Sequence, residues 1–103
     1  MARIALLATI TANEGSESEV EEAFKQAVAR VGDEPGTLVY ALHRKADDPR
    51  SFVFFEVYES NEAADAHRAG EALKELGPKL AGKVAGRPEI TRLDPVAAKG
   101  LPG

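Results

Sequence analysis

The segment from Ser51 to Glu59, SFVFFEVYE, constrains the fold of this chain more than any other feature. It is rich in aromatic and β-branched residues and therefore predicts a strand. Successive side chains of a strand point to opposite faces, and here both faces are apolar: Phe52 and Phe54 on one, Val53, Phe55 and Val57 on the other. Arg3–Thr11, RIALLATIT, shows the same two-sided pattern. Such strands need cover on both faces of their sheet.

The other predicted elements follow from local signals. Two overlapping capping boxes at Ser16 and Ser18 predict a helix that ends near Gly32. A second helix begins at Ser60, bends at Gly70 and is interrupted at Gly77-Pro78. Together with the two strands above, we expect strands at Thr37–Arg44 and Arg87–Leu93, and a polar loop over Ala46–Arg50.

The order β-α-β-β-α-β is that of a ferredoxin-like α+β fold with an antiparallel sheet. At 103 residues the chain is expected to form a single domain over residues 1–95, followed by a tail over 96–103 that is rich in proline and glycine. The helices of this fold cover only one face of the sheet. We therefore expect a second copy of the chain to cover the open face, sheet against sheet, in a two-fold homodimer.

Composition excludes several classes of function. A net charge of -4 with scattered basic residues argues against nucleic acid and anionic membranes as partners. The chain has no cysteine, and no phosphate-binding loop, dinucleotide fingerprint or hydrolase elbow. No apolar stretch approaches the roughly 20 residues that span a bilayer, and the N-terminus has the pattern of a strand rather than a signal peptide. We expect a cytoplasmic protein.

His67 is the main candidate for acid–base chemistry, because the chain has only two histidines. It lies in step with Ala63, Ala64 and Gly70 on the apolar side of its helix, where small neighbours leave room for a ligand. The alternative is a core histidine bonded to a backbone carbonyl. His43, near a strand end, is expected to be exposed to solvent.

Glu56 interrupts the run of apolar and aromatic residues in this strand and lies on the same face as Phe52, Phe54 and Tyr58. Such a carboxylate must be paired or have a raised pKa, so it is either an acid or the partner of an arginine across the dimer. Arg44 and Arg92 are the candidate arginines. Parity alone leaves open which face of the sheet holds Glu56.

Tyr40 and Tyr58 each combine an apolar ring with a polar tip. This combination suits either core packing or the orientation of a phenolic ligand. An iron site made of His43, His67 and Glu56 has no support in the spacing of these residues.

Three segments resemble the antibiotic biosynthesis monooxygenase (ABM) family: residues 34–40 (EPGTLVY), residues 48–60 (DPRSFVFFEVYES) and Ala63 with Ala66-His67. The resemblance implies a dimeric α+β barrel of ferredoxin-like fold. The family includes cofactor-independent monooxygenases of polyphenols and quinols, haem-degrading relatives and an isomerase. Many members have tryptophan at the position of Tyr58, and this chain has none, which disfavours the haem-degrading branch. Many also have a further histidine near Glu71-Ala72, which is absent here.

For this chain the resemblance implies a cofactor-independent monooxygenase without a metal, acting on a small aromatic, phenolic or quinol molecule. His67 would be the base, Tyr40 and Tyr58 would orient the ring together with Glu56, and Phe54 and Leu73 would form an apolar wall. Two alternatives remain open: a dimeric small-molecule-binding or stress-related protein without catalysis, and a dicarbonyl isomerase that uses the same base without oxygen.

Overall fold

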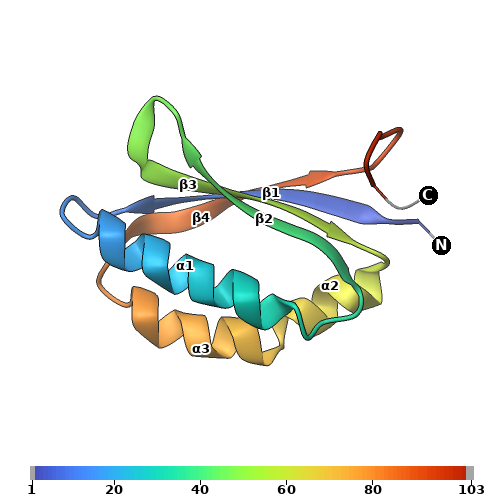
Figure 1. Ribbon diagram of the computed structural model, residues 1–103, viewed down its shortest axis with the longest axis horizontal. Helices are drawn as coiled ribbons and strands as arrows, with labels where there is room; N and C mark the ends of the chain where they lie inside the picture. The colour runs from blue at the N-terminus through green and yellow to red at the C-terminus, as the bar shows by residue number, and fades with distance from the viewer. Residues whose placement is uncertain (1, 102–103) are drawn as a thin grey trace.

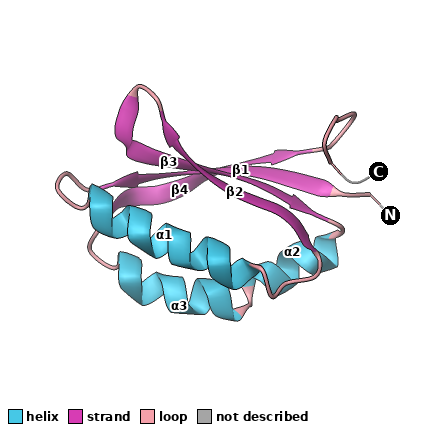
Figure 2. Ribbon diagram, viewed as in Figure 1, coloured by secondary structure: helices cyan, strands magenta, loops and turns pink. Residues whose placement is uncertain are grey.

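A four-stranded antiparallel sheet carries all the helices on one face in the computed structural model, which describes residues 2–101 (Figures 1 and 2). The sheet order is β2-β3-β1-β4. In chain order the elements are β1 (Ile4–Ala12), α1 (Glu17–Val31), β2 (Thr37–Lys45), β3 (Asp48–Tyr58), α2 (Asn61–Arg68), α3 (Glu71–Leu80) and β4 (Val84–Leu93). This architecture confirms the predicted α+β, ferredoxin-like fold with an antiparallel sheet.

The predicted second helix is two helices. α2 ends at Arg68, and Gly70 is the N-cap residue of α3. The predicted interruption at Gly77-Pro78 is wrong, because α3 continues through Pro78 to Leu80. The helix tolerates this proline close to its end, where only a short stretch follows the lost backbone hydrogen bond.

Capping differs between the helices. Ser16 is the N-cap residue of α1 but its side chain makes no capping hydrogen bond, and Ser18 lies inside the helix, so the predicted capping boxes do not form. Ser60 does cap α2, where its hydroxyl accepts a hydrogen bond from the Ala63 N–H at 3.1 Å. Gly32 ends α1 as predicted.

Two strands extend further than the sequence indicates. The predicted loop over Ala46–Arg50 is shorter, because β3 begins at Asp48. The Asp48 carboxylate accepts hydrogen bonds from the Arg50 N–H and the Ser51 hydroxyl, which stabilises this start. β4 begins at Val84 rather than Arg87, since Val84 pairs with Ala12 of β1.

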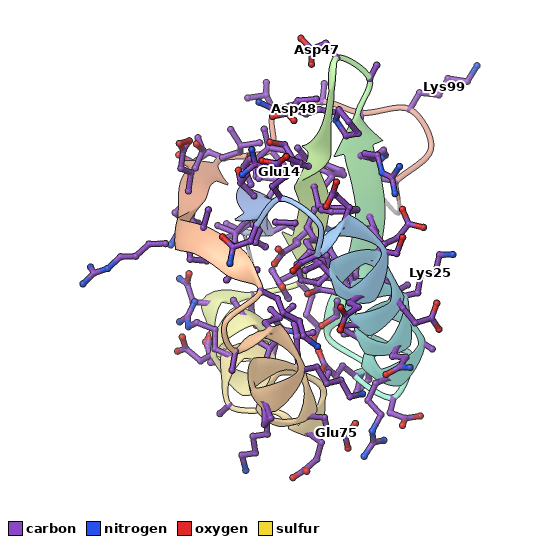
Figure 3. The ribbon with its side chains drawn as sticks, turned by 90° about the vertical axis from the view of Figure 1, so that its left-hand side faces the viewer. Glu14, Lys25, Asp47, Asp48, Glu75 and Lys99 are labelled. Carbon is purple, nitrogen blue, oxygen red and sulfur yellow. The ribbon has the colours of Figure 1, made fainter. Side chains whose placement is uncertain are left out.

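The core lies between the sheet and the helices. Phe24 of α1 contacts Phe52 and Phe54 of β3 edge to face, with ring centroids 5.6 and 5.0 Å apart. Glu56 and Tyr58 continue the same alternation, so they lie on the helix-covered face, which answers the question that parity left open. Charged side chains such as Lys25 of α1 and Glu75 of α3 point away from this layer (Figure 3).

No helix covers the opposite face of the sheet (Figure 1). Leu7 of β1 is 37% exposed there, and Val53 and Phe55 of β3 are half-buried. The strand pairing therefore confirms that β3 has apolar side chains on both faces of the sheet.

β4 leads into a segment without helix or strand over residues 94–101; the last two residues of the predicted tail lie outside the described residues. No helix within residues 2–101 is long and apolar enough to cross a membrane.

Candidate active site

His67 lies between two tyrosine rings on the helix-covered face of the sheet. It comes from α2 and is only 4% exposed. Its ring centroid is 4.9 Å from that of Tyr40 on β2 and 5.3 Å from that of Tyr58 on β3. Phe54 stacks on the other side of Tyr40, at 4.7 Å. Four residues predicted for the site are therefore contiguous.

The turn before β2 fixes the position of α2. The backbone N–H of Glu34 donates to Val31 O, and that of Thr37 donates to Glu34 O, so the turn closes directly after α1. A Cβ atom on Gly36 would lie 2.6 Å from the Cβ atom of Ala63 in the first turn of α2. Glycine thus permits a contact that no other residue allows, and α2 is held close to the turn.

The imidazole of His67 binds a carboxylate that the sequence analysis did not select. His67 Nδ1 lies 2.7 Å from Glu34 Oε1, and the Thr37 hydroxyl donates to the same oxygen at 2.9 Å. The alternative of a core histidine bonded to a backbone carbonyl is therefore wrong for Nδ1. Glu34 opens the EPG segment on which the family resemblance rests, and that was the one available signal for it.

Glu56 accepts a hydrogen bond from the Tyr58 hydroxyl at 2.5 Å. Burial raises the pKa of Glu56, while the hydrogen bond from Tyr58 and the nearby His67 oppose the rise in this pKa only in part. Glu56 thus holds a proton more readily than a glutamate in water.

Within the chain, neither candidate arginine contacts Glu56. Arg44 pairs with Glu21 of α1, and Arg92 donates to Asn61. Leu6 of β1 separates Arg92 from Glu56 in the sheet, and Arg44 lies opposite Phe52, further along β3. A pairing across a dimer stays a prediction.

Both tyrosines remain protonated near neutral pH. Burial, followed by the charges of Glu56 and Glu34, raises the pKa of Tyr40. Burial and the hydrogen bond to Glu56 raise the pKa of Tyr58. These hydroxyls therefore act as hydrogen-bond donors rather than as bases.

Two polar atoms of the site are available to a ligand. Within residues 2–101, the Tyr40 hydroxyl and His67 Nε2 make no hydrogen bond. The only fully enclosed side-chain nitrogen or oxygen without a partner in that range is Glu17 Oε1, so both atoms reach accessible surface. The site thus offers one acceptor or base and one donor beside aromatic rings.

Leu73 adjoins the site through an apolar cluster, whereas His43 lies elsewhere. Leu73 of α3 is half-buried and packs against the apolar cluster that contains Phe54. His43 is exposed, as expected, on the open face of β2. A surface hollow of about 230 Å³ lies between α1 and β2, and its lining includes His43 but not His67, Tyr40 or Tyr58. In the described part of the chain, no three acidic or histidine side chains converge as metal ligands.

Comparisons with known proteins bear on the family and the fold. The sequence profile of the antibiotic biosynthesis monooxygenase family matches residues 3–77. A Caulobacter crescentus protein of the antibiotic biosynthesis monooxygenase type is 31% identical, with a TM-score of 0.87 over 93% of this chain and 92% of that one. A Pseudomonas aeruginosa protein is 26% identical, with a TM-score of 0.86 over 94% and 97% of the two chains.

At lower identity the likeness shows the fold alone. A Mycobacterium tuberculosis protein, Rv0793, is 22% identical, with a TM-score of 0.85 over 94% of this chain and 98% of that one. No curated protein matches the chain. The family profile spans more than half of the sequence and includes Glu34, Tyr40, Glu56, Tyr58 and His67. The chain belongs to the antibiotic biosynthesis monooxygenase family.

Proposed function

We propose that this protein is a cofactor-independent monooxygenase that oxidises a small phenolic or quinol substrate, with His67 as the base. One observation carries the proposal: a buried histidine has one ring nitrogen on a carboxylate and the other free beside two tyrosine rings. A base that is oriented in this way can accept a proton from a substrate hydroxyl. Membership of the family supports the reaction class.

Each residue of the site has a role in this reaction. His67 Nε2 takes the proton of the substrate hydroxyl, and Glu34 balances the positive charge that the imidazole then carries. The Tyr40 hydroxyl donates a hydrogen bond to the substrate oxyanion. Tyr58 and Glu56 complete the polar side of the site, and Phe54 and Leu73 form its apolar wall.

The substrate itself supplies the electrons. Once deprotonated, an electron-rich phenol gives one electron to dioxygen, and the radical pair combines as a peroxide at a ring carbon that carries hydrogen. The peroxide takes back the proton from His67, and loss of water from the resulting hydroperoxide leaves a carbonyl at this ring carbon, so that the phenol becomes a quinone. The substrate loses four electrons and dioxygen gains four; one oxygen atom enters the product and the other leaves as water. The protein contributes the base, the orientation and a site with little water.

We also propose that the protein is a homodimer that joins two sheets through their open faces. Leu7, Val53 and Phe55 form an apolar surface on this face that no helix covers. Burial of this surface against a second copy satisfies both faces of β3 and leaves the helix-covered face for the ligand.

Oxygen uptake tests the proposed reaction. With a panel of phenols and quinols and a metal chelator present, we expect the wild type to consume dioxygen with at least one compound. His67→Ala should lose this activity by about 100-fold or more while it keeps the wild-type circular dichroism spectrum. His43→Ala is the matched control and should retain full activity, because His43 is exposed on the opposite face.

The alternatives give different results in the same experiment. Binding of panel compounds without oxygen uptake would contradict the oxygenase and support a binding protein. Conversion of a dicarbonyl compound without oxygen uptake would support the isomerase. Full activity of His67→Ala would exclude His67 as the base.

A further inference from the structure

We propose that Glu34 is a positioning residue that fixes the tautomer of His67, so that Nδ1 carries the proton and Nε2 is the free acceptor. Nothing in the family resemblance assigned a role to this glutamate beyond its place in the EPG segment. The catalytic consequence rests on the proposed function of His67, but the tautomer itself is a property of the protein without substrate.

The hydrogen bonds at one oxygen atom determine the direction of donation. Glu34 Oε1 lies 2.7 Å from His67 Nδ1 and 2.9 Å from the Thr37 hydroxyl. The Thr37 hydroxyl donates to this oxygen. In its carboxylate form Glu34 can only accept, so the hydrogen in the second bond then comes from Nδ1. In a neutral imidazole with Nδ1–H, Nε2 has a free lone pair.

The carboxylate of Glu34 is held by its own turn and by its hydrogen bonds with Thr37 and His67. The turn is closed by backbone hydrogen bonds from Glu34 to Val31 and from Thr37 to Glu34. The second oxygen, Oε2, lies 3.3 Å from the position that a Cβ atom on Gly70 would occupy, so glycine at this position leaves room for the carboxylate. A carboxylate with so little freedom fixes the imidazole ring as well as its proton.

Low exposure strengthens the interaction. The side chains of His67 and Glu34 are 5% and 19% exposed, whereas those of the surface ion pairs Arg30–Asp33 and Arg68–Asp65 are 41% to 77% exposed. Water screens a buried pair less than an exposed one. Glu34 can therefore balance the charge of His67 when the imidazole accepts a second proton.

A purely structural role is the competing explanation. In that case the Glu34–His67 bond would only tie the turn before β2 to α2, and either tautomer or a water-bridged ring would serve. The two explanations differ in the proton position in the resting protein and in the effect on turnover. Neither difference depends on how stable the variants are.

Nitrogen-15 NMR of the two histidines measures the tautomer directly. The spectra are recorded at a pH where the nitrogen shifts show that both imidazole rings are neutral. We then expect His67 in the Nδ1–H form and the exposed His43 as a mixture of the Nδ1–H and Nε2–H tautomers. In Glu34→Ala, the signals of His67 should move toward those of His43. Glu62→Ala removes an exposed glutamate of α2 and should leave both histidines unchanged. His67 in the Nε2–H form in the wild type would overturn the proposal without any variant.

Kinetics with an accepted quinol separate this inference from the proposed function. We expect Glu34→Ala to lower kcat by about 100-fold with little change in KM, because substrate contacts persist while the base is misoriented. If wild type and His67→Ala behave as proposed but Glu34→Ala keeps wild-type kcat, the positioning role is wrong and the oxygenase stands. If no compound is oxidised but the His67 tautomer changes in Glu34→Ala, the positioning role stands and the proposed oxygenase activity is wrong.

Discussion

At the scale of single residues, the site contains two carboxylates in different surroundings. Glu34 accepts hydrogen bonds from Thr37 and His67. Glu56 accepts one from Tyr58, and its burial raises its pKa. In the proposed reaction Glu34 balances the charge of the base, whereas the raised pKa of Glu56 favours its protonated form. This difference separates two groups of the same chemical type into different roles.

The raised pKa of Glu56 predicts a pH-dependent effect on stability. Because its pKa is higher in the folded chain than in the unfolded chain, ionisation of Glu56 costs the folded state stability as the pH rises from acid through the raised pKa. Glu56→Gln keeps an acceptor for Tyr58 and cannot ionise. The free energy of unfolding of the variant, relative to that of the wild type, should therefore increase across this window in urea titrations. A constant difference at all pH values would contradict the prediction.

The sequence predicts which residues lie in the site better than it predicts the hydrogen bonds between them. Alternation along β3 places Glu56 with Phe52, Phe54 and Tyr58, and helix periodicity places His67 on an apolar stripe; both expectations are met. The partner of His67 could not be predicted by either rule. Glu34 lies 33 positions away in an irregular turn, where no periodicity indicates the direction of a side chain.

At the scale of elements, α2 depends on the turn that precedes β2. α2 is a short helix, and isolated helices of its length are marginal in water. Its first turn contacts Gly36 through Ala63, and the Ser60 hydroxyl caps it. The position of His67 therefore depends on a contact between two small residues at some distance from the imidazole.

Gly36→Ala should destabilise the protein by about 1–3 kcal/mol, because the added methyl group overlaps with Ala63. The double variant Gly36→Ala/Ala63→Gly removes the overlap. Its loss of stability in urea unfolding should be smaller than the sum of the two single losses. Additive losses would show that the contact is not close in solution.

Element boundaries were the least accurate sequence predictions, for physical reasons that differ from case to case. The strands are longer than predicted where pairing with a neighbour extends them, as at Val84. The capping boxes of α1 failed because a serine followed by glutamate permits a capping hydrogen bond without enforcing it. At Gly70 the sequence predicted a bend, and the structure has two separate helices there, with Gly70 as the N-cap residue of α3.

At the scale of the whole molecule, the sheet has one face covered by helices and one face that no helix covers. The helix-covered face holds the candidate active site, and the open face holds Leu7, Val53 and Phe55. The two-sided apolar pattern of β3 indicated this division from the sequence. The second copy that we propose to cover the open face stays a prediction, because no pattern within one chain determines what covers it.

We expect the wild type to sediment as a dimer at micromolar concentration. Leu7→Glu places a charge on the open face and should shift the protein to a monomer with an unchanged circular dichroism spectrum. Ala29→Glu places the same charge on the exposed surface of α1 and is expected to leave the dimer intact. A monomeric wild type would contradict the proposed interface.

The fate of the two atoms of dioxygen tests the central claim most directly. Purified protein, chelator and an accepted quinol are incubated under isotopically labelled dioxygen, and the products are analysed by mass spectrometry. We predict one labelled oxygen atom in each organic product, the second in water, and loss of both signals in His67→Ala. Unlabelled product, or labelled product formed equally by His67→Ala, would contradict a reaction in which this histidine starts the transfer of oxygen.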